Sequence, residues 1–295
     1  MATPILLPPK VDFVFKRIFG NEKHPNVLIS FLNAVLTPVD PIKKVTLKDT
    51  TIEKESLESK FSRLDVKATT DKGEEINIEI QVKDEGNMIQ RSLYYWSRIY
   101  HEQIKKGDDY EQLSRTICIN LLNFNLLDTT DYHSVYRLKE CRRNTELTDL
   151  IELHFIELKK MKNVNRIEDV NSQLEAWLHF INHPESDLVQ ALEQKNQELK
   201  EAKEELIRLS GDEKERQRYN KRMETLSNEK SALRSAEEKG IKKGIAQGIE
   251  QGIEQGAKLE KIEIAKNAIK NGFDNETIIK LTGLSLAEVE RLRKE

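Results

Sequence analysis

Cysteine is scarce in this chain of 295 residues, and the two that occur, Cys118 and Cys141, stand alone. Neither has a partner at the spacing of a zinc site or of a redox motif. The six histidines are scattered in the same way, without a pair at ligand spacing. The scarcity of cysteine argues against a disulfide framework, and we expect a protein of a reducing compartment.

Long apolar runs and net positive charge are missing too. No stretch of about 18 apolar residues occurs, and the first residues, MATPILLPPKVDF, lack the charged and apolar regions of a signal peptide. We therefore expect a soluble cytoplasmic protein. The formal net charge is -3, so the whole chain does not have the basic surface of a protein that coats nucleic acid. Contact with nucleic acid would need a local patch or a bound metal.

The residues that are present predict alternating helices and strands in the first 125 positions. Residues 12–36 have apolar side chains at helical spacing, with a break near Gly20 and Pro25. β-Branched residues then indicate a strand that begins at Val45. Two more strands follow within 62–83, and a helical pattern and a further strand complete an α-β-β-β-α-β order. Later segments predict another strand, LIELHFIEL, and another helix, NSQLEAWLHFI.

The stretch SRLDVKATTDKGEEINIEIQVK, residues 62–83, predicts two strands joined by a short loop around residues 71–73. Strand alternation puts Leu64, Val66 and Ala68 on one face and Asp65 on the other. In the second strand it puts Ile76, Ile78 and Ile80 on one face and Glu79 on the other. A slip by one residue would set isoleucines against polar side chains. The register that keeps the apolar faces together places Asp65 opposite Glu79.

Two opposed carboxylates have Cβ atoms roughly 5 Å apart and repel each other. They can share one Mg²⁺, because this cation takes oxygen ligands and cancels the repulsion. A second interpretation is that both carboxylates are solvated and that Arg63, Lys67 and Lys83 relieve the repulsion, since charged outer faces of hairpins are common. The spacing of Asp65 and Glu79 leaves both interpretations open.

The ordered set of motifs resembles a known family. Asp on the first strand and Glu-x-Gln on the second, within this element order, are similar to the PD-(D/E)xK nuclease superfamily, and more closely to the Rpn family of recombination-promoting nucleases and transposases. The matching pieces are DFVFKRIF near the start, RLDV at 63–66, IEIQ at 78–81, RSLYYWSRIY at 91–100 and YEQLSRTICINLLNF after it. The Asp and Glu-x-Gln motif alone is short, so the resemblance depends on the ordered set over some 120 residues.

This resemblance implies an α/β fold, with a restriction-endonuclease-like αβββαβ core and a mostly helical, extended C-terminal part. It implies a metal-dependent DNA endonuclease that uses Mg²⁺ or another divalent cation and has a role in recombination or mobile elements. DNA would be the partner. A rival interpretation is a weakly active or inactive nuclease-like protein that serves as an oligomerising interaction module.

Carried over position by position, the resemblance makes Asp65 and Glu79 the metal ligands, with the backbone carbonyl of Ile80 as a third. Gln81 completes the catalytic set, but it stands where the superfamily usually has lysine. An amide can orient water or phosphate by hydrogen bonds and cannot supply a positive charge. Asp12 resembles an acidic residue that the first helix of such enzymes contributes to the metal; alternatively it is a first-turn acid or an N-cap.

Four basic residues are candidates for DNA contact. Lys67 and Lys83 lie on the two predicted strands and would lend charge near Gln81, whereas Arg91 and Arg98 share a face of the following helix and would hold phosphates. Exposed helix arginines are more often only solvated. We expect the aromatic residues 94–96 to pack that helix on the sheet.

The chain changes character after Pro184. We predict a nuclease-like domain at 1–184, a charged and solvated helical arm at 185–239 with a break near Ser210 and Gly211, a repeat at 240–257 and a small helical bundle at 258–295.

Glycine recurs at every fourth position of the repeat, each followed by isoleucine or, at its end, alanine. The repeat is either a helix with a narrow stripe for a second helix, which would make a homo-oligomer, or a low-complexity linker. Glycine costs about 1 kcal/mol relative to alanine within a helix, so a helix here would need compensating contacts.

The final segment predicts three short helices. Gly272 would end the first, Asp274 would cap the second, and Ser285 with Glu288 would form a capping box on the third. These helices are either a helix-turn-helix reader of DNA or a small protein-contact bundle. The acidic residue Glu290 beside the arginines of the last helix favours the bundle.

Overall fold

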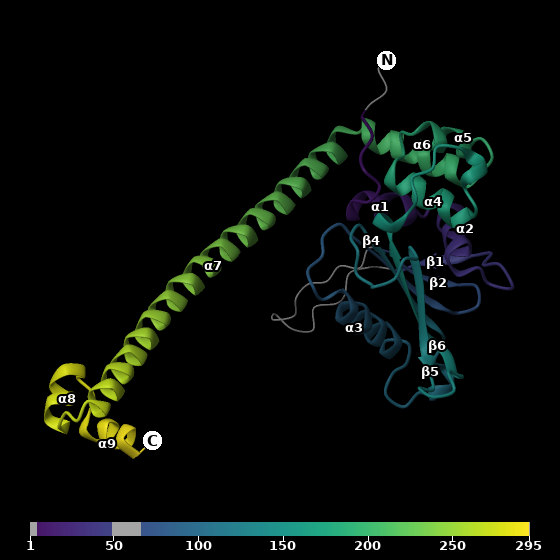
Figure 1. Cartoon of the computed structure of the whole chain (residues 1–295). Coiled ribbons are helices and arrows are strands. Elements are labelled where there is room, and N and C mark those ends of the chain that lie inside the picture. The colour runs from purple at the N-terminus through teal and green to yellow at the C-terminus, as the bar shows by residue number, and fades with distance from the viewer. Residues whose placement is uncertain (1–4, 49–65, 295) are drawn as a thin grey trace. The chain divides into compact units, whose positions relative to one another are not determined.

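The computed structural model describes residues 5–48 and 66–294, and it divides the chain into two compact units, Met1–Tyr219 and Asn220–Glu295. The elements are seen in Figure 1. They are, in chain order, α1 Asp12–Phe19, α2 Pro25–Leu36, β1 Val45–Leu47, β2 Val66–Thr70, β3 Glu75–Gln81, α3 Met88–His101, β4 Thr116–Leu122, β5 His133–Lys139, β6 Glu146–Glu157, α4 Gln173–Asn182, α5 Asp187–Glu193, α6 Gln197–Gly211, α7 Glu213–Lys270, α8 Asn275–Thr282 and α9 Leu286–Lys294. Single 3₁₀ turns lie at Tyr110–Gln112, Leu158–Lys160 and Ile167–Asp169.

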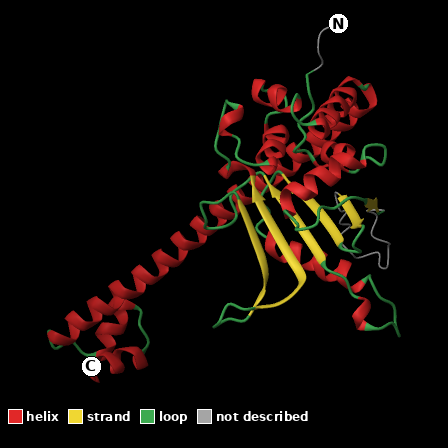
Figure 2. Cartoon of the chain, turned by 90° about the vertical axis from the view of Figure 1, so that its right-hand side faces the viewer, coloured by secondary structure: helices red, strands yellow, loops and turns green. Residues whose placement is uncertain are grey.

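A six-stranded mixed sheet forms the centre of the first unit, in the order β1-β2-β3-β4-β6-β5 (Figure 2). Strands β3, β4 and β6 are parallel, and β1, β2 and β5 pair antiparallel with their neighbours. The predicted αβββαβ order and the α/β class are confirmed. Strand β5 was not predicted; it lies at an edge of the sheet and has mostly exposed side chains.

One face of the sheet carries the large apolar core. The isoleucines of β3 and β4 on this face are buried against helices that include α1, α2 and α4. Four rings from these helices stack or meet edge to face, with centroids 4.4 to 6.3 Å apart, and they belong to Phe15, Phe19, Phe31 and Trp177. Aromatic pairs in this geometry add to the stabilisation from burial. This core fixes the position of β3, and therefore of Glu79.

Helix α3 covers the other face of β3 and β4. Met88 at its start packs with Cys118 and Leu122 of β4, and the indole of Trp96 donates a hydrogen bond to the carbonyl of Thr116 at 3.1 Å. The expectation for the aromatic residues holds for Trp96, whereas Tyr95 is buried with Ile99 of the same helix in a separate cluster. It is wrong for Tyr94, which is about half exposed at the surface of the helix.

The region after Pro184 is more buried than its composition indicates. Helices α5 and α6 belong to the first unit, and Leu199, Leu206 and Leu209 of α6 are buried in the main core. The expectation of a solvated arm is therefore wrong for this part, because apolar residues at helical spacing turn one face of α6 inward while its charged residues cover the other. The predicted break is present: α6 ends at Gly211 and α7 begins at Glu213.

The second unit ends in a small helical core. Ala265 and Ala268 of α7 pack with Ile278, Leu284 and Val289. The predicted caps are confirmed: the Asp274 carboxylate accepts a hydrogen bond from the backbone N–H of Thr277 at 2.9 Å, and Ser285 and Glu288 exchange side chain to backbone hydrogen bonds. The first of the three predicted short helices is instead the end of α7.

The glycine repeat is helical throughout, because residues 240–256 all lie within α7. The helix that the first interpretation requires is therefore present, and its contact with a second helix stays a prediction. Within the described residues, none of the helices has the length and hydropathy to cross a membrane.

Candidate active site

Glu79 occupies the third-last position of β3, where it pairs with Asn120 of β4. Its side chain is only 1% exposed, because α3 lies over this face of the sheet. The interpretation of a solvated carboxylate is therefore wrong for Glu79. A carboxylate out of water needs hydrogen bonds or an opposite charge, and this requirement makes the surroundings of Glu79 informative.

Arg91, on the first turn of α3, supplies the opposite charge. Its Nη2 lies 3.3 Å from Oε2 of Glu79, and its Nη1 lies 3.8 Å from a carboxylate oxygen of Glu85 in the preceding loop. The guanidinium also lies over the ring of Tyr95, 5.4 Å from the centroid. Burial lowers the pKa of Arg91, but Glu79, Tyr95 and Glu85 raise it by more, so the net shift is upward and Arg91 stays protonated.

Gln81 lies on the same face of β3, at the end of the strand. Its amide nitrogen is 3.5 Å from Oε2 of Glu79, and its backbone carbonyl accepts a hydrogen bond from Asn123. Two donors of different charge, Arg91 and Gln81, thus approach the same oxygen of Glu79.

Asp65, the second predicted ligand, lies outside the described residues, and so does Arg63. The structure does describe the register on which the prediction depends, up to Val66. Val66 pairs with Ile78 and Ala68 pairs with Ile76, across a turn at residues 71–74. The apolar faces of the hairpin are matched as predicted, and the opposition of Asp65 and Glu79 stays a prediction.

The remaining predicted metal ligands lie on two elements. Ile80 follows Glu79 on β3, and its side chain points to the opposite, apolar face. Asp12 is the first residue of α1, in the first turn of the helix and not at its N-cap, and its carboxylate accepts a hydrogen bond from the backbone N–H of Phe13 at 2.8 Å. Helix α1 contacts β3.

The other predicted basic residues are not grouped around Glu79. Lys67 of β2 and Arg98 of α3 both bind the carboxylate of Glu102, at 2.9 and 3.0 Å. Arg91 and Arg98 were predicted to share a role, but they have different partners: Arg91 binds Glu79 and Arg98 binds Glu102. Lys83 is half-buried in the loop between β3 and α3.

The donor atoms around Glu79 suit a hard divalent cation. The Glu79 carboxylate and the Ile80 backbone carbonyl offer oxygen atoms on consecutive residues of one strand, and oxygen is the donor that such cations take. Within residues 5–48 and 66–294, no group of three or more His, Cys, Asp or Glu side chains is arranged to hold a metal ion. The second carboxylate predicted for a site at Glu79 belongs to Asp65, outside these residues.

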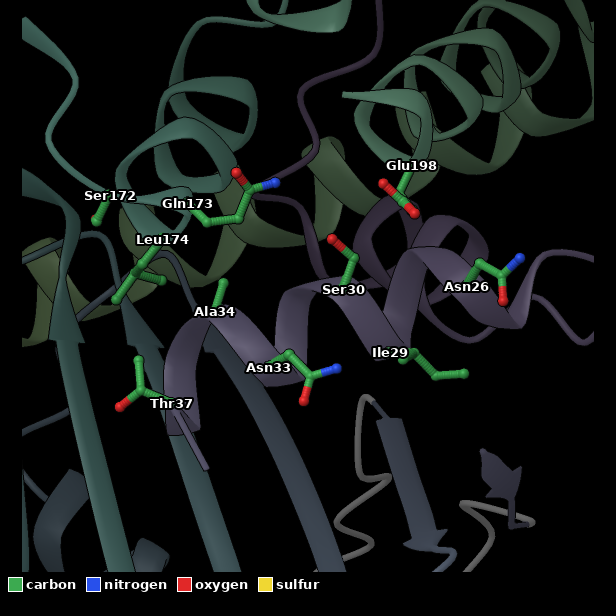
Figure 3. A pocket seen from close by; sticks show the side chains of 10 residues that line it. All are labelled: Asn26, Ile29, Ser30, Asn33, Ala34, Thr37, Ser172, Gln173, Leu174 and Glu198. Carbon is green, nitrogen blue, oxygen red and sulfur yellow. The ribbon is translucent and has the colours of Figure 1, made fainter. Parts of the chain in front are cut away.

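A pocket of about 440 Å³ lies elsewhere in the first unit, between α2 and the starts of α4 and α6 (Figure 3). Amide and hydroxyl side chains such as Asn26, Ser30 and Gln173 line it, with one carboxylate from Glu198. Its lining offers hydrogen bonds and negative charge, which do not suit a polyanion. This pocket is separate from Glu79 and does not support the predicted chemistry.

A second buried polar group, not predicted from the sequence, is centred on Glu152 of β6 and includes residues of β5 and the residue before β4. Both oxygens of the Glu152 carboxylate are used: Arg115 binds it at 2.6 Å, Arg137 also binds it, and Nε2 of His154 lies 2.8 Å away. The other ring nitrogen of His154 meets His133 at 2.9 Å. The signal was present in LIELHFIEL, where Glu152 and His154 occupy alternate positions of a strand that is mostly apolar.

The C-terminal helices α8 and α9 are joined by a three-residue turn in which Gly283 has a positive φ of 69°. A short turn with glycine between two helices is typical of a helix-turn-helix. Along α9, Glu290, Arg291 and Arg293 are exposed. Arg293 also binds Asn275 at the start of α8, at 2.6 Å.

Two family models match the chain. Residues 9–236 match the family described as PD-(D/E)XK nuclease family transposase, and residues 258–294 match the family described as Rpn/YhgA-like nuclease family, C-terminal HTH domain. The first match covers 228 of the 295 residues. The second corresponds to the helix-turn-helix alternative for the last helices, and not to the favoured protein-contact bundle. No curated protein and no solved structure is similar enough to the chain to count as a match.

Proposed function

The chain belongs to the PD-(D/E)XK nuclease family transposases, and on this premise we propose that it is a metal-dependent DNA endonuclease that hydrolyses phosphodiester bonds in recombination or in the movement of mobile elements. The observation that carries the proposal is the buried Glu79 carboxylate on β3, in a hairpin register that brings the start of β2 to it. A buried carboxylate on a strand needs a functional or electrostatic reason.

In this proposal Asp65 and Glu79 hold Mg²⁺ or another divalent cation, with the Ile80 carbonyl as a further ligand and Asp12 as an additional acid. When bound, the cation activates the attacking water and offsets charge on the phosphate. Arg91 places a positive charge beside the Glu79 carboxylate, and Gln81 orients water or phosphate by hydrogen bonds. Helix α3 excludes bulk water from Glu79 and thereby strengthens these interactions.

Metal removal and a ligand variant test the proposal together. We expect the full chain to nick or linearise supercoiled plasmid in Mg²⁺, to stop in EDTA and to resume when Mg²⁺ is restored. Asp65→Ala should lose cleavage by about 100-fold or more, because one carboxylate alone holds the cation weakly. Gel electrophoresis of the plasmid measures all four conditions.

Continued cutting by the Asp65→Ala variant would remove Asp65 from the mechanism. No cutting by the unmodified chain with any divalent cation would favour the rival function, a nuclease-like protein that acts through assembly.

DNA is the proposed partner of both parts of the chain. Helix α9 is the element that would enter the major groove, because it is the second helix of the helix-turn-helix match. Its first exposed residues include Leu286 and Glu288, and Glu288 is bound to Ser285 in the capping box. The basic residues Arg291 and Arg293 follow further along α9 and would contact phosphates.

The second part of the proposal is that the chain forms a homo-oligomer through α7. Four isoleucines at a spacing of four residues are 55 to 69% exposed on this helix, beside glycines whose missing side chains leave open space; they are Ile241, Ile245, Ile249 and Ile253. Glycines let a second helix approach closely, and the isoleucines would then be buried. The segment is basic at Lys242 and Lys243 and acidic at Glu250 and Glu254, so antiparallel copies would place opposite charges at the same level.

A charge placed in the isoleucine row tests this assembly. We expect Ile245→Lys and Ile249→Lys in one chain to lower the mass in solution to that of a monomer, because two buried lysines cost more than the contact provides. Light scattering coupled to size-exclusion chromatography gives the mass. Gln247→Lys with Gln251→Lys in one chain is the matched control, since it adds the same two charges to the same part of α7 outside the row. An unchanged mass in the double variant would show that α7 is not the contact between copies.

A further inference from the structure

We propose that Arg91 supplies the positive charge that Gln81 cannot, and that it is the catalytic cation of this chain. The inference rests on the proposed nuclease function. Nuclease sites need a cation beside the metal to stabilise negative charge that develops on the phosphate. At position 81 the chain has a neutral amide, so the charge must come from another element.

The position of Arg91 meets this need. Its guanidinium lies 3.3 Å from Oε2 of Glu79, although the two residues belong to different elements, β3 and α3. The Glu79 side chain is 1% exposed and that of Arg91 is 26% exposed. Arg91 therefore contacts the buried carboxylate and still reaches the surface, where a phosphate would arrive.

Two further contacts hold the guanidinium in place. The ring of Tyr95, one turn later on α3, packs against the guanidinium, and the carboxylate of Glu85, in the loop before α3, forms an ion pair with its Nη1. Tyr95 is buried and fixed in its own right. A guanidinium that is held by a ring and by two carboxylates loses little freedom on binding a phosphate, and its fork of N–H donors matches two phosphate oxygens.

Two of the other candidate cations are engaged elsewhere. Lys67 and Arg98 both bind Glu102, and the side chain of Lys67 is largely buried in that contact. Their shared carboxylate separates them from Glu79. Arg91 thus differs from Arg98 in partner, although both lie on α3 and both are expected to contact DNA from the sequence alone.

The pairing has a consequence for metal binding. Arg91 and a divalent cation both seek the oxygens of Glu79, so Arg91 competes with the metal when DNA is absent. Removing the charge of Arg91 should therefore leave metal affinity equal or higher while it lowers cleavage. A residue that merely supported the fold of the site would lower both.

The test uses the full chain and four variants: Arg91→Met, Arg91→Lys, Gln81→Lys with Arg91→Met, and Arg208→Met. Plasmid cleavage and Mn²⁺ binding by isothermal titration calorimetry are measured for each. Arg208→Met is the matched control, because Arg208 also binds a buried glutamate, Glu205 at 2.7 Å, from a helix. It should change neither quantity.

We expect Arg91→Met to cut plasmid about 100-fold more slowly and to bind Mn²⁺ at least as tightly as the unmodified chain. Arg91→Lys should retain more activity than Arg91→Met. The double variant should regain about tenfold over Arg91→Met, because lysine at position 81 returns a charge to the same face of β3.

Three results would overturn the inference. Cleavage by Arg91→Met at the unmodified rate would show that the charge is not needed, and a joint loss of cleavage and Mn²⁺ binding would reduce Arg91 to support of Glu79. In either case the unmodified chain still cuts, so the nuclease function stands. A chain that cuts with neither Mg²⁺ nor Mn²⁺ would overturn the nuclease function, and the inference with it.

Discussion

Glu79→Gln is expected to lower plasmid cleavage by roughly 1,000-fold, the largest functional effect of a single substitution in this chain. The change keeps the size of the side chain and one of its oxygens, and it removes the charge that a divalent cation requires. Mn²⁺ binding by calorimetry should be lost in parallel, because the neutral amide has no negative charge to offset that of the cation. The rate of plasmid cleavage in Mg²⁺ is the primary measurement.

Glu75→Gln is the matched control for this variant. Glu75 lies on the same strand and the same face as Glu79, and it is also buried. Its carboxylate binds Lys48 at 2.5 Å and Thr69 at 3.0 Å, so its partners belong to the β1–β2 side of the sheet. We expect near-normal cleavage. Equal losses in both variants, with equal losses of thermal stability, would assign Glu79 to the fold and contradict a catalytic role.

Local patterns in the sequence were sufficient for the hairpin. The alternation around Val66 and Ile78 has a period of two residues, and a one-residue slip would expose a row of isoleucines. The register could therefore be predicted from 20 or so consecutive residues, and the structure confirms its described part. Capping by Asp274 and Ser285 was predictable for the same reason, since both ends of each hydrogen bond lie within three residues.

Contacts between elements far apart in the sequence could not be predicted from such local patterns. The polar face of β3 has the composition of a solvated surface, and only the return of α3 over it makes Glu79 a buried carboxylate. The choice of Arg91 as its partner, and of Glu102 as the partner of Arg98, depends on how α3 is rotated on the sheet. Arg91 and Arg98 are seven residues apart, about two helical turns, and lie on the same side of α3, so the sequence pattern does not decide which of them meets Glu79.

Composition was misleading where apolar residues are few but well placed. Helix α6 is rich in charge, yet Leu199 and Leu206 lie on one face and enter the core. Strand β5 was not predicted because its side chains are mostly exposed and give no apolar pattern. It is held to β6 by backbone hydrogen bonds, which residues of almost any type can form.

Glu152→Ala should destabilise the first unit more than any other single loss of a charge that we consider, by about 3 kcal/mol in the free energy of unfolding. The variant would leave Arg115 and Arg137 without the carboxylate that binds them, and His154 without its partner at 2.8 Å. Both arginines are partly exposed, so water can take up some of their charge, and the loss lies at the lower end of the range for a buried ion pair. Urea unfolding followed by circular dichroism measures it.

The matched control is Glu146→Ala, which removes another carboxylate that binds Arg137, at 3.4 Å, from an exposed position of β6. Its loss should be within about 0.5 kcal/mol, because exposed ion pairs contribute little. A loss as large as that of Glu152→Ala would mean that the contact of Arg137, and not the burial of Glu152, determines the effect.

The dependence of the unfolding free energy on pH gives an independent measurement of the same interaction. Burial raises the pKa of Glu152, but the hydrogen bond and charge of His154 and the charge of Arg115 lower it by more, to about 2. The pKa of a glutamate in the unfolded chain is about 4.3. A carboxylate with a depressed folded pKa stabilises the protein above its unfolded pKa, and this stabilisation declines as the pH falls toward the folded pKa. The difference in unfolding free energy between the unmodified chain and Glu152→Ala should therefore be constant from pH 7 to about 5 and become smaller between about pH 4.5 and 2. A difference that stays constant down to about pH 2.5 would contradict the role assigned to this carboxylate.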